Sequence, residues 1–319
     1  MKYKKTAIIF GITGQDGAYL SHFLLQKGYK VIGTTRKKTK KNLFRLDRLK
    51  IIKKIILFKG EATNLKFFKK VLNLKIDEIY YLSGDSSVLK SFINPKNSLK
   101  SNTEGILNIL ETLRKKKKKI RLFNAGSGQF YGDNKKNFYN IDSKIEPQSP
   151  YGVSKAAAYW LVKIYREKYG LHCCTGVFFN HESPLRSKEF VTKKIVDTAL
   201  KMKKDKNVKL RLGNIDIYRD WGWAPEYMKA IWLMMQKNKP KDLVIGSGKI
   251  HTLREFTNEV FRVLKLNKRN LITGVKKFKR NTDIRGYKAD IKLTKKTLNW
   301  EPKLNIKQII FKMVNNELF

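Results

Sequence analysis

The chain has 319 residues, of which 41% are hydrophobic and 12% aromatic, so the composition supports a packed core and excludes global disorder. Lys and Arg number 70 against 26 Asp and Glu, which gives a formal net charge of +44 at pH 7. Because the lysines are spread along the whole chain without a zinc-finger or RNA-binding motif, we expect a lysine-rich surface that favours phosphate-bearing substrates. We expect no dedicated nucleic-acid partner.

The first part of the chain alternates short apolar runs with amphipathic stretches, which is the pattern of repeated βαβ units. Strands are predicted at Ala7–Gly11, Lys30–Thr35, Ile55–Lys59, Glu78–Leu82, Arg121–Ala125 and His172–Phe179. Helices are predicted at Ala18–Lys27, Asn64–Leu74, Asn97–Lys116 and Ser154–Tyr169. Since parallel strands need crossover helices, we expect an α/β fold with a doubly wound parallel sheet.

The alternation fades after Asn180. Helices are predicted at Lys188–Lys204 and Pro225–Asn238, with short strands near Lys209–Leu212 and Leu243–Ile245. We expect these segments to form a smaller α/β lobe at the carboxyl edge of the sheet, where open α/β sheets bind ligands.

Other features of the sequence narrow the class further. No run of ~18 apolar residues exists, so no membrane span is predicted. The chain has two adjacent cysteines, Cys173 and Cys174, and a disulfide between neighbours is unusual, so we expect a reducing, cytoplasmic location. Each of the four histidines stands apart from a second ligand at metal spacing, so no metal site is expected.

A glycine-rich turn follows the first predicted strand and opens the first predicted helix. It reads Gly11-Ile12-Thr13-Gly14-Gln15-Asp16-Gly17. Glycines let the backbone approach a pyrophosphate, and a helix N-terminus favours negative charge. In this position the turn predicts a dinucleotide site on a Rossmann-type sheet, with an ordinary glycine turn as the alternative.

The second predicted strand is followed by two cations, Arg36 and Lys37. A dinucleotide without a 2′-phosphate usually meets an acidic residue at this point, whereas cations suit a 2′-phosphate. The pattern favours NADP over NAD, and two further surface charges are the alternative.

Tyr151 and Lys155 stand four residues apart and share one face of a helix. An ammonium beside a phenol lowers the phenol's pKa, and the phenolate can then take a proton from a hydroxyl whose carbon gives a hydride to a nicotinamide. Ser127 ends the preceding strand and can hydrogen-bond the reacting oxygen. These three residues predict a site for alcohol oxidation.

Together these motifs resemble the extended short-chain dehydrogenase/reductase family and, within it, the GDP-mannose 4,6-dehydratases, over most of the chain. The sharpest matching blocks are Asn180-His181-Glu182-Ser183-Pro184 and Arg219-Asp220-Trp221-Gly222. Phe190-Val191-Thr192 and Leu298-Asn299-Trp300-Glu301-Pro302 extend the match. The resemblance implies a bound NADP that takes a hydride from C4 of a hexose and returns it to C6 after water has left from C5 and C6.

The resemblance also implies roles for individual residues. Tyr151 is the base at O4, Lys155 activates it and holds the ribose, and Ser127 replaces a usual threonine. The cofactor is expected to contact Gly11, Thr13, Gly14, Gln15, Asp16, Gly17, Arg36, Glu61, Tyr151 and Lys155. The GDP-sugar substrate is expected to contact Asn180, Glu182, Val191, Lys194 and Arg219.

Two departures from the family pattern bear on the reaction. Gln129 stands where the family has a glutamate that serves as acid and base in the elimination, and Asp85 stands where it usually has glutamine. Three hypotheses follow. The protein is a GDP-sugar 4,6-dehydratase in which Asp85 or water replaces the missing acid, a 4-epimerase or 4-ketosugar reductase that has lost elimination, or a weak binding protein. The presence of Tyr151, Lys155 and Ser127 argues against the third.

The resemblance further implies a division of the chain and its assembly. Residues 1–180 would form the NADP-binding Rossmann domain, to which a segment near 213–245 returns, and residues 181–319 would mainly form the nucleotide-sugar-binding lobe. A homodimer or homotetramer is expected. The sequence leaves the base and sugar of the substrate open.

Overall fold

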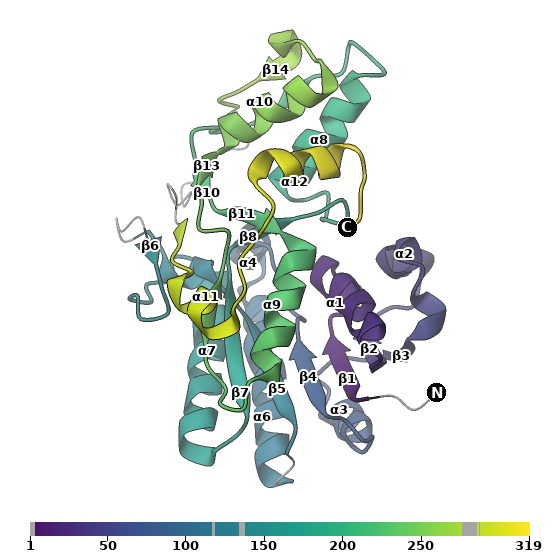
Figure 1. Cartoon of the computed structure of the whole chain (residues 1–319), viewed down its shortest axis with the longest axis vertical. Coiled ribbons are helices and arrows are strands. Elements are labelled where there is room, and N and C mark those ends of the chain that lie inside the picture. Colours follow the sequence, from purple (N-terminus) through teal and green to yellow (C-terminus); the bar gives the residue numbers. More distant parts are fainter. Residues whose placement is uncertain (1–3, 117–118, 134–137, 276–285, 287) are drawn as a thin grey trace.

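The computed structural model describes residues 4–116, 119–133, 138–275, 286 and 288–319, and its centre is a seven-stranded parallel sheet (Figure 1). The strands run in the order β12-β7-β5-β4-β1-β2-β3. They are β1 (Thr6–Phe10), β2 (Lys30–Thr35), β3 (Ile56–Lys59), β4 (Glu78–Tyr81), β5 (Arg121–Ser127), β7 (Cys173–Phe178) and β12 (Leu243–Ile245). The chain order reverses between β1 and β4, so the predicted Rossmann-type doubly wound sheet is confirmed.

The two faces of the sheet carry separate hydrophobic clusters, because successive strand residues point to opposite sides. Ala7 and Ile9 of β1 belong to one cluster, together with residues of α1 (Gln15–Gln26) and α9 (Ala224–Gln236). Ile8 and Phe10 belong to the other, together with residues of α3 (Leu65–Leu72), α6 (Gly105–Lys115) and α7 (Pro150–Tyr169). Each large apolar side chain buried in this way contributes about 1.5–3 kcal/mol to folding.

Helix α7 carries the tyrosine and lysine of the predicted site, and its start is fixed by local sequence. The Ser149 hydroxyl accepts a 3.0 Å hydrogen bond from the N–H of Gly152, and Pro150 lies in the first turn. The helix ends at Gly170, whose φ of +64° favours glycine. It begins four residues before the predicted start, which places Tyr151 in its first turn.

One predicted helix differs from the structure. The stretch from Asn97 to Lys116 is divided into α5 (Pro95–Leu99), a π-helical turn (Lys100–Glu104) and α6. The amide of Asn102 donates to the carbonyl oxygens of Ser98 and Asp85, at 3.1 and 3.2 Å. The bond to Asp85 ties the π turn to the loop after β4, and turns of this kind often occur at functional sites.

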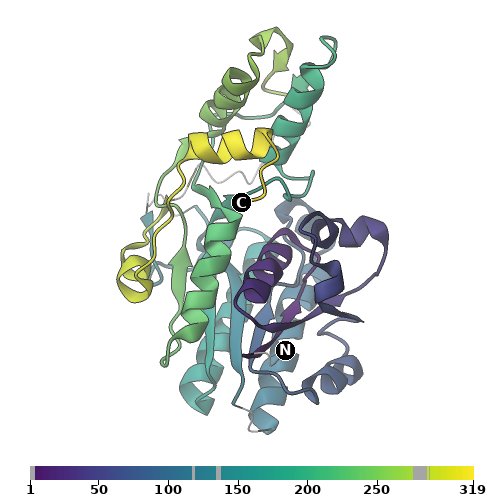
Figure 2. The same cartoon turned by 45° about the vertical axis from the view of Figure 1, so that its right-hand side comes forward.

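A second group of elements lies beyond the carboxyl ends of the sheet strands (Figures 1 and 2). Helices α8 (Val191–Met202), α10 (Leu253–Leu264) and α12 (Ile306–Val314) share a hydrophobic cluster with Trp221 and Trp223. Short strands pair beside them, namely β8 (Asn180–Glu182) with β11 (Trp221–Trp223), β9 (Leu210–Arg211) with β14 (Leu271–Ile272), and β10 (Tyr218–Arg219) with β13 (His251–Thr252). The proposed division of the chain at residue 180 stays a prediction.

The remaining elements connect these parts. They are α2 (Lys40–Arg48), α4 (Val88–Ile93), α11 (Lys292–Leu298), the paired strands β6 (Phe138–Tyr139) and β15 (Lys288–Ala289), and the 3-10 turns at Ile52–Lys54, Gly128–Tyr131 and Lys268–Asn270. Among the described residues, no helix has the length and apolarity to cross a membrane.

Candidate active site

The glycine-rich turn joins β1 to α1 at the carboxyl end of the sheet. Gly11 has a φ of +85°, a left-handed conformation that favours glycine, and its carbonyl oxygen accepts a 3.0 Å hydrogen bond from the N–H of Gly14. A Cβ on Gly17 would overlap the backbone of Gly11 and Ile12, so α1 can start this close to β1 only with glycine there. Within the described chain no side chain caps α1, so its first N–H groups fit an anion such as a pyrophosphate.

Arg36 and Glu61 follow neighbouring strands at the same edge of the sheet, β2 and β3. The Nε of Arg36 is 3.7 Å from the Oε1 of Glu61, and both side chains are exposed, at 74% and 47%. An exposed pair of this kind contributes at most about 1 kcal/mol. The guanidinium of Arg36 can therefore turn toward a phosphate group without losing a strong interaction.

Ser127 and Gln129 lie where β5 passes into a 3-10 turn. The Ser127 hydroxyl accepts a 3.3 Å hydrogen bond from the N–H of Gln129. An added Cβ on Gly152 would lie 2.9 Å from the carbonyl oxygen of Gln129, so this glycine allows the turn to pack closely on α7. Gln129 is thereby placed beside the first turn of α7, which carries Tyr151.

Tyr151 and Lys155 are both almost fully buried, at 7% exposure each. The Nζ of Lys155 donates a 2.8 Å hydrogen bond to the carbonyl oxygen of Ala125 in β5 and lies 5.9 Å from the ring centroid of Tyr151. Burial lowers the pKa of Lys155 from 10.5 to about 8. The ammonium is thus held between the strand that ends in Ser127 and the phenol whose ionised form it can stabilise.

Asp85 lies in the loop after β4. Its Oδ1 accepts a 3.3 Å hydrogen bond from the N–H of Ser87, whose hydroxyl accepts one from the N–H of Lys90 at the start of α4. The Asp85 carboxylate therefore helps to shape its own loop. Its expected role as a substitute acid stays a prediction.

The expected substrate residues are distributed over β8, β10 and α8. Asn180 and Glu182 are the first and last residues of β8, which pairs with β11. Glu182 is 1% exposed, accepts a 2.7 Å hydrogen bond from the Thr192 hydroxyl, and has its Oε2 3.4 Å from the Nε of Arg186. Burial raises the pKa of Glu182. Glu182 is thus already engaged with protein groups, and its expected contact with the nucleotide stays a prediction.

The two cations among the expected substrate residues come from different elements. Lys194, in α8, donates to the carbonyl oxygen of Arg211 at 2.7 Å, and burial lowers the pKa of this lysine. Arg219, in β10, donates to the carbonyl oxygen of Tyr218 at 2.6 Å. Val191 is the first residue of α8. The roles of these residues in substrate binding stay predictions.

Asp220, which the sequence analysis named only within the Arg219-Asp220-Trp221-Gly222 block, holds three segments together. The carboxylate is fully buried and accepts hydrogen bonds from the N–H and hydroxyl of Ser247 and from the N–H groups of Gly248 and Ala289. It thereby ties the end of β10 to the loop after β12 and to β15. A lone aspartate in a Trp-rich block carries no signal for partners that lie 27 to 69 residues away.

Sequence reasoning also missed Arg45 and His181 as linking residues. Arg45 donates to the carbonyl oxygens of Thr13 at 3.0 Å and Leu185 at 2.7 Å, and so joins the glycine turn to the segment after β8. The side chains of Gln15 and Asp16 face the same segment: the Oδ1 of Asp16 lies 2.9 Å from the Nε2 of His181. The expected contacts of Gln15 and Asp16 with the cofactor stay predictions.

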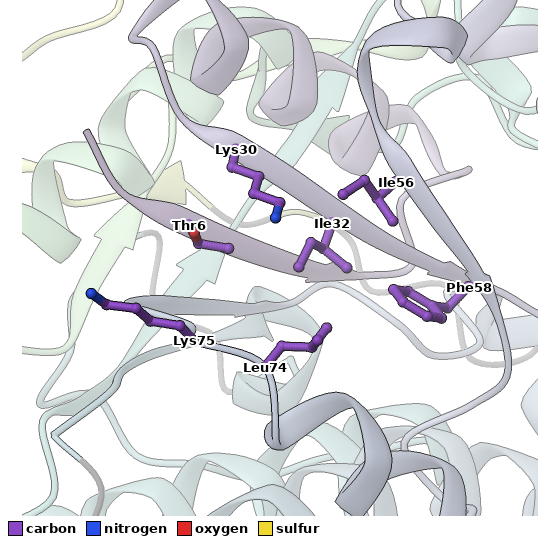
Figure 3. A pocket seen from close by; sticks show the side chains of 7 residues that line it. All are labelled: Thr6, Lys30, Ile32, Ile56, Phe58, Leu74 and Lys75. Atoms are coloured by element: carbon purple, nitrogen blue, oxygen red, sulfur yellow. The ribbon is translucent and has the colours of Figure 1, made fainter. Parts of the chain in front are cut away.

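A cavity of about 280 Å³ lies at the end of the sheet opposite to the glycine turn (Figure 3). It is lined by Thr6, Lys30, Ile32, Ile56, Phe58, Leu74 and Lys75. Thr6 and Lys30 are the first residues of β1 and β2, so the cavity is remote from the glycine turn.

Among the described residues, no three His, Cys, Asp or Glu side chains are grouped as metal ligands.

The amino-acid sequence of the chain is similar to those of known proteins. A family model described as GDP-mannose 4,6 dehydratase matches residues 8–313. GDP-mannose 4,6 dehydratase 1 of Arabidopsis thaliana is 36% identical over 329 residues, covering 100% of this chain and 91% of the relative. The GDP-mannose 4,6-dehydratase of Vibrio cholerae O1 and the human GDP-mannose 4,6 dehydratase are each 33% identical and cover 99% of this chain and 94% and 92% of their own lengths.

Solved structures share the fold. UDP-glucose 4-epimerase of Thermotoga maritima, with UDP-glucose, has a TM-score of 0.87 at 21% identity and covers 97% of both chains. The dTDP-glucose 4,6-dehydratase of Bacillus anthracis, in complex with NAD, has a TM-score of 0.85 at 23% identity and covers 98% of this chain and 96% of the other. Epimerases and dehydratases thus share this architecture, so the fold alone does not distinguish the two reactions.

Proposed function

The chain belongs to the GDP-mannose 4,6 dehydratase family, and we propose that it is a 4,6-dehydratase of GDP-mannose or a close GDP-sugar. One observation carries the proposal. Ser127, Tyr151 and the buried ammonium of Lys155 are grouped at the carboxyl end of β5, in a sheet whose glycine turn fits a dinucleotide.

The first step follows from these three residues. The Tyr151 phenolate takes the proton from O4 while the Lys155 ammonium stabilises the phenolate charge, and the Ser127 hydroxyl positions O4. A bound nicotinamide would supply the acceptor for the C4 hydride and the donor of a hydride to C6. The same tyrosine, as a neutral phenol, keeps the new C4 ketone hydrogen-bonded, which acidifies the proton at C5.

The elimination step needs two proton transfers that the side chain of Gln129 cannot carry out. Water leaves when the C5 proton is removed and the C6 hydroxyl is protonated, and an amide can transfer neither proton. Gln129 can hydrogen-bond the sugar hydroxyls, while water or Asp85 carries the protons. The alternative, a 4-epimerase or 4-ketosugar reductase without elimination, rests on this one residue and is less favoured because full-length relatives from plants, animals and bacteria are named dehydratases.

NADP is the proposed cofactor. The exposed Arg36 that follows β2 supports it, because its pair with Glu61 is weak enough to yield to a 2′-phosphate. NAD is the alternative, and it is bound in the solved structure of the Bacillus anthracis dehydratase.

We also propose that the protein is a cytoplasmic homodimer or homotetramer. Two free, buried cysteines support a reducing compartment. Large apolar side chains are exposed on neighbouring helices α4 and α7, including Ile93 at 78%, Phe92 at 47%, Trp160 at 46% and Ile164 at 47%. Such a surface suits a second copy, and Ile93→Lys should shift the mass in light scattering to that of a smaller assembly.

The experiment that tests the reaction is mass spectrometry of GDP-mannose incubated with purified protein and NADP in deuterated water. A product that has lost one water and gained deuterium supports the dehydratase. An intact mass with a changed sugar configuration, or with reduced cofactor, indicates that the chemistry stops at C4. If neither change occurs, the proposed substrate is wrong.

A further inference from the structure

Two side-chain pairs cross-link the glycine turn, where the dinucleotide is expected, to the segment of β8 and Ser183, where the nucleotide sugar is expected. The Oδ1 of Asp16 is 2.9 Å from the Nε2 of His181, and the Ser183 hydroxyl donates to the Oε1 of Gln15 at 2.8 Å. The amide nitrogen of Gln15 also donates to the carbonyl oxygen of His181 at 3.3 Å. Residues more than 160 positions apart in the chain are thus joined by three hydrogen bonds.

Both ring nitrogens of His181 have a protein partner. Its Nδ1 is 2.8 Å from the carbonyl oxygen of Phe179, and its Nε2 faces the carboxylate of Asp16. Burial opposes ionisation of Asp16, but the charge and hydrogen bond of His181 and the hydrogen bond from Gln15 lower the pKa of Asp16 to about 2. Both ring nitrogens thus lie within hydrogen-bond distance of a protein oxygen, and the carboxylate of Asp16 is held against the imidazole.

The Asp16–His181 bridge is shielded from solvent, since the His181 side chain is 8% exposed and that of Asp16 25%. The ring of Tyr227 packs on His181 with centroids 5.0 Å apart, and that of Phe178 at 5.1 Å. A charged hydrogen bond in such surroundings is stronger than one at the surface. The glycine turn therefore cannot move relative to β8 without breaking the hydrogen bond between Asp16 and His181.

The same segment carries an expected substrate residue and contacts α8. Glu182 stands between His181 and Ser183 and accepts the hydrogen bond of Thr192, the second residue of α8. The guanidinium of Arg45 adds a parallel link, because it binds the carbonyl oxygen of Thr13 in the glycine turn and that of Leu185. A continuous set of contacts thus runs from the start of α1 to the start of α8.

We propose that the Asp16–His181 bridge, with the Gln15–Ser183 hydrogen bond beside it, couples dinucleotide binding to nucleotide-sugar binding. Asp16, Gln15, His181 and Ser183 are positioning residues. A ligand that orders the glycine turn also orders the loop from β8 to α8, so each ligand lowers the ordering cost for the other. The inference rests on the proposed function, because that function assigns the two segments to two ligands.

The test measures binding rather than turnover. The dissociation constant of NADPH is determined by fluorescence titration with and without saturating GDP, and that of GDP with and without saturating NADPH. We expect GDP to tighten NADPH binding about tenfold in the wild-type protein, and NADPH to tighten GDP binding by the same factor, as linkage requires. In Ser183→Ala and His181→Ala we expect the factor to fall below about twofold.

Matched variants separate coupling from general damage. Ser21 is a buried serine like Ser183, but it lies on α1 and its hydroxyl donates to the carbonyl oxygen of Gly17 within the same helix. Ser21→Ala should therefore keep the tenfold factor. His181→Gln, whose amide nitrogen can donate to Asp16, should restore part of the coupling. If His181→Ala does not fold, the same factor measured in Ser183→Ala and Asp16→Asn decides the question.

The outcomes distinguish the inference from the function on which it rests. A wild-type protein that binds NADPH and GDP independently overturns the inference and leaves the proposed function standing. Coupling that persists in Ser183→Ala and Asp16→Asn also overturns it. A wild-type protein that binds neither ligand overturns both. Equal losses of coupling in Asp16→Asn, His181→Ala and their double variant would support the bridge acting as one unit.

Discussion

The Nζ of Lys155 donates a 2.8 Å hydrogen bond to the carbonyl oxygen of Ala125, with the lysine side chain buried between α7 and β5. Burial lowers the pKa of Lys155 to about 8, against 10.5 in an exposed lysine. At pH 7 the folded protein therefore holds a charge that its surroundings disfavour. Under the proposed function, this position would serve the chemistry of Tyr151 at the expense of stability.

Lys155→Met is expected to stabilise the protein and abolish its activity. The difference between the pKa of Lys155 in the unfolded and the folded protein corresponds to about 3 kcal/mol of unfolding free energy that the variant regains. Loss of the hydrogen bond to Ala125 reduces the expected gain to about 2 kcal/mol. Between pH 8 and 10.5 the unfolded lysine is still protonated while the folded one is neutral, so wild-type stability rises with pH there and the advantage of the variant shrinks.

Urea denaturation of both proteins at about pH 7 and about pH 10 measures this difference, on either side of the lowered pKa. Because all other titrating groups are shared, the change in the difference between the two pH values reports on Lys155 alone. A variant that is less stable than wild type at neutral pH would contradict the prediction.

Arg36→Ala is expected to weaken NADPH binding roughly tenfold more than NADH binding. The 2′-phosphate loses a charged partner that NADH does not use, while the exposed pair with Glu61 contributes little in the free protein. Fluorescence titrations of both cofactors give the ratio. Lys38→Ala, two residues further along the same exposed segment, is the control and should leave the ratio unchanged. Equal weakening of NADPH and NADH binding would show that Arg36 does not contact the 2′-phosphate.

Gly17→Ala is expected to destabilise the protein by about 3 kcal/mol, because the new methyl group would overlap backbone atoms of Gly11 and Ile12 that cannot move aside. Gly14→Ala is the matched comparison: its Cβ would lie 3.3 Å from the carbonyl oxygen of Gly11, so the expected change is below about 1 kcal/mol. Chemical denaturation of the two variants measures both values. Similar stabilities would mean that α1 can shift away from β1.

The central sheet was predictable from the sequence because each strand is a short apolar run bounded by turns. β2 was predicted at its observed bounds, and β1, β3 and β4 within a residue or two. The division of the helix before Lys116 was not predictable, because it depends on Asn102 bonding to the loop at Asp85, 17 positions away in the chain. Helical periodicity alone continues through such a turn.

The sequence predicted the parts of the candidate site that lie within one segment, but not the contacts between distant segments. Motif spacing indicated the Tyr151–Lys155 pair and the glycine turn, since each lies within one short segment, but it did not indicate that Lys155 bonds the carbonyl oxygen of Ala125. It gave no sign that the side chains of Gln15 and Asp16 face Ser183 and His181, because that contact depends on how the segment at β8 packs against α1. Local patterns specify local geometry, whereas contacts between the two parts of the chain need the folded arrangement.

Gln129→Glu is expected to raise the rate of elimination by a factor of about 10² to 10⁴, the usual contribution of one general acid–base group. The N–H of Gln129 bonds the Ser127 hydroxyl and its carbonyl oxygen packs against Gly152, so the substitution keeps a side chain of the same size beside the first turn of α7. Formation of dehydrated product from GDP-mannose is followed by mass spectrometry. Hydride exchange at C4, measured with deuterated substrate, should stay unchanged because Tyr151 and Ser127 are untouched.

A parallel Asp85→Asn variant shows whether that carboxylate supplies the acid in the wild-type protein. If Gln129→Glu leaves the elimination rate unchanged while Asp85→Asn abolishes elimination, the acid has moved to the loop after β4, and the reading of position 129 as the block is wrong. If neither substitution changes the elimination rate, water carries both protons, and the side chain of Gln129 only orients the sugar.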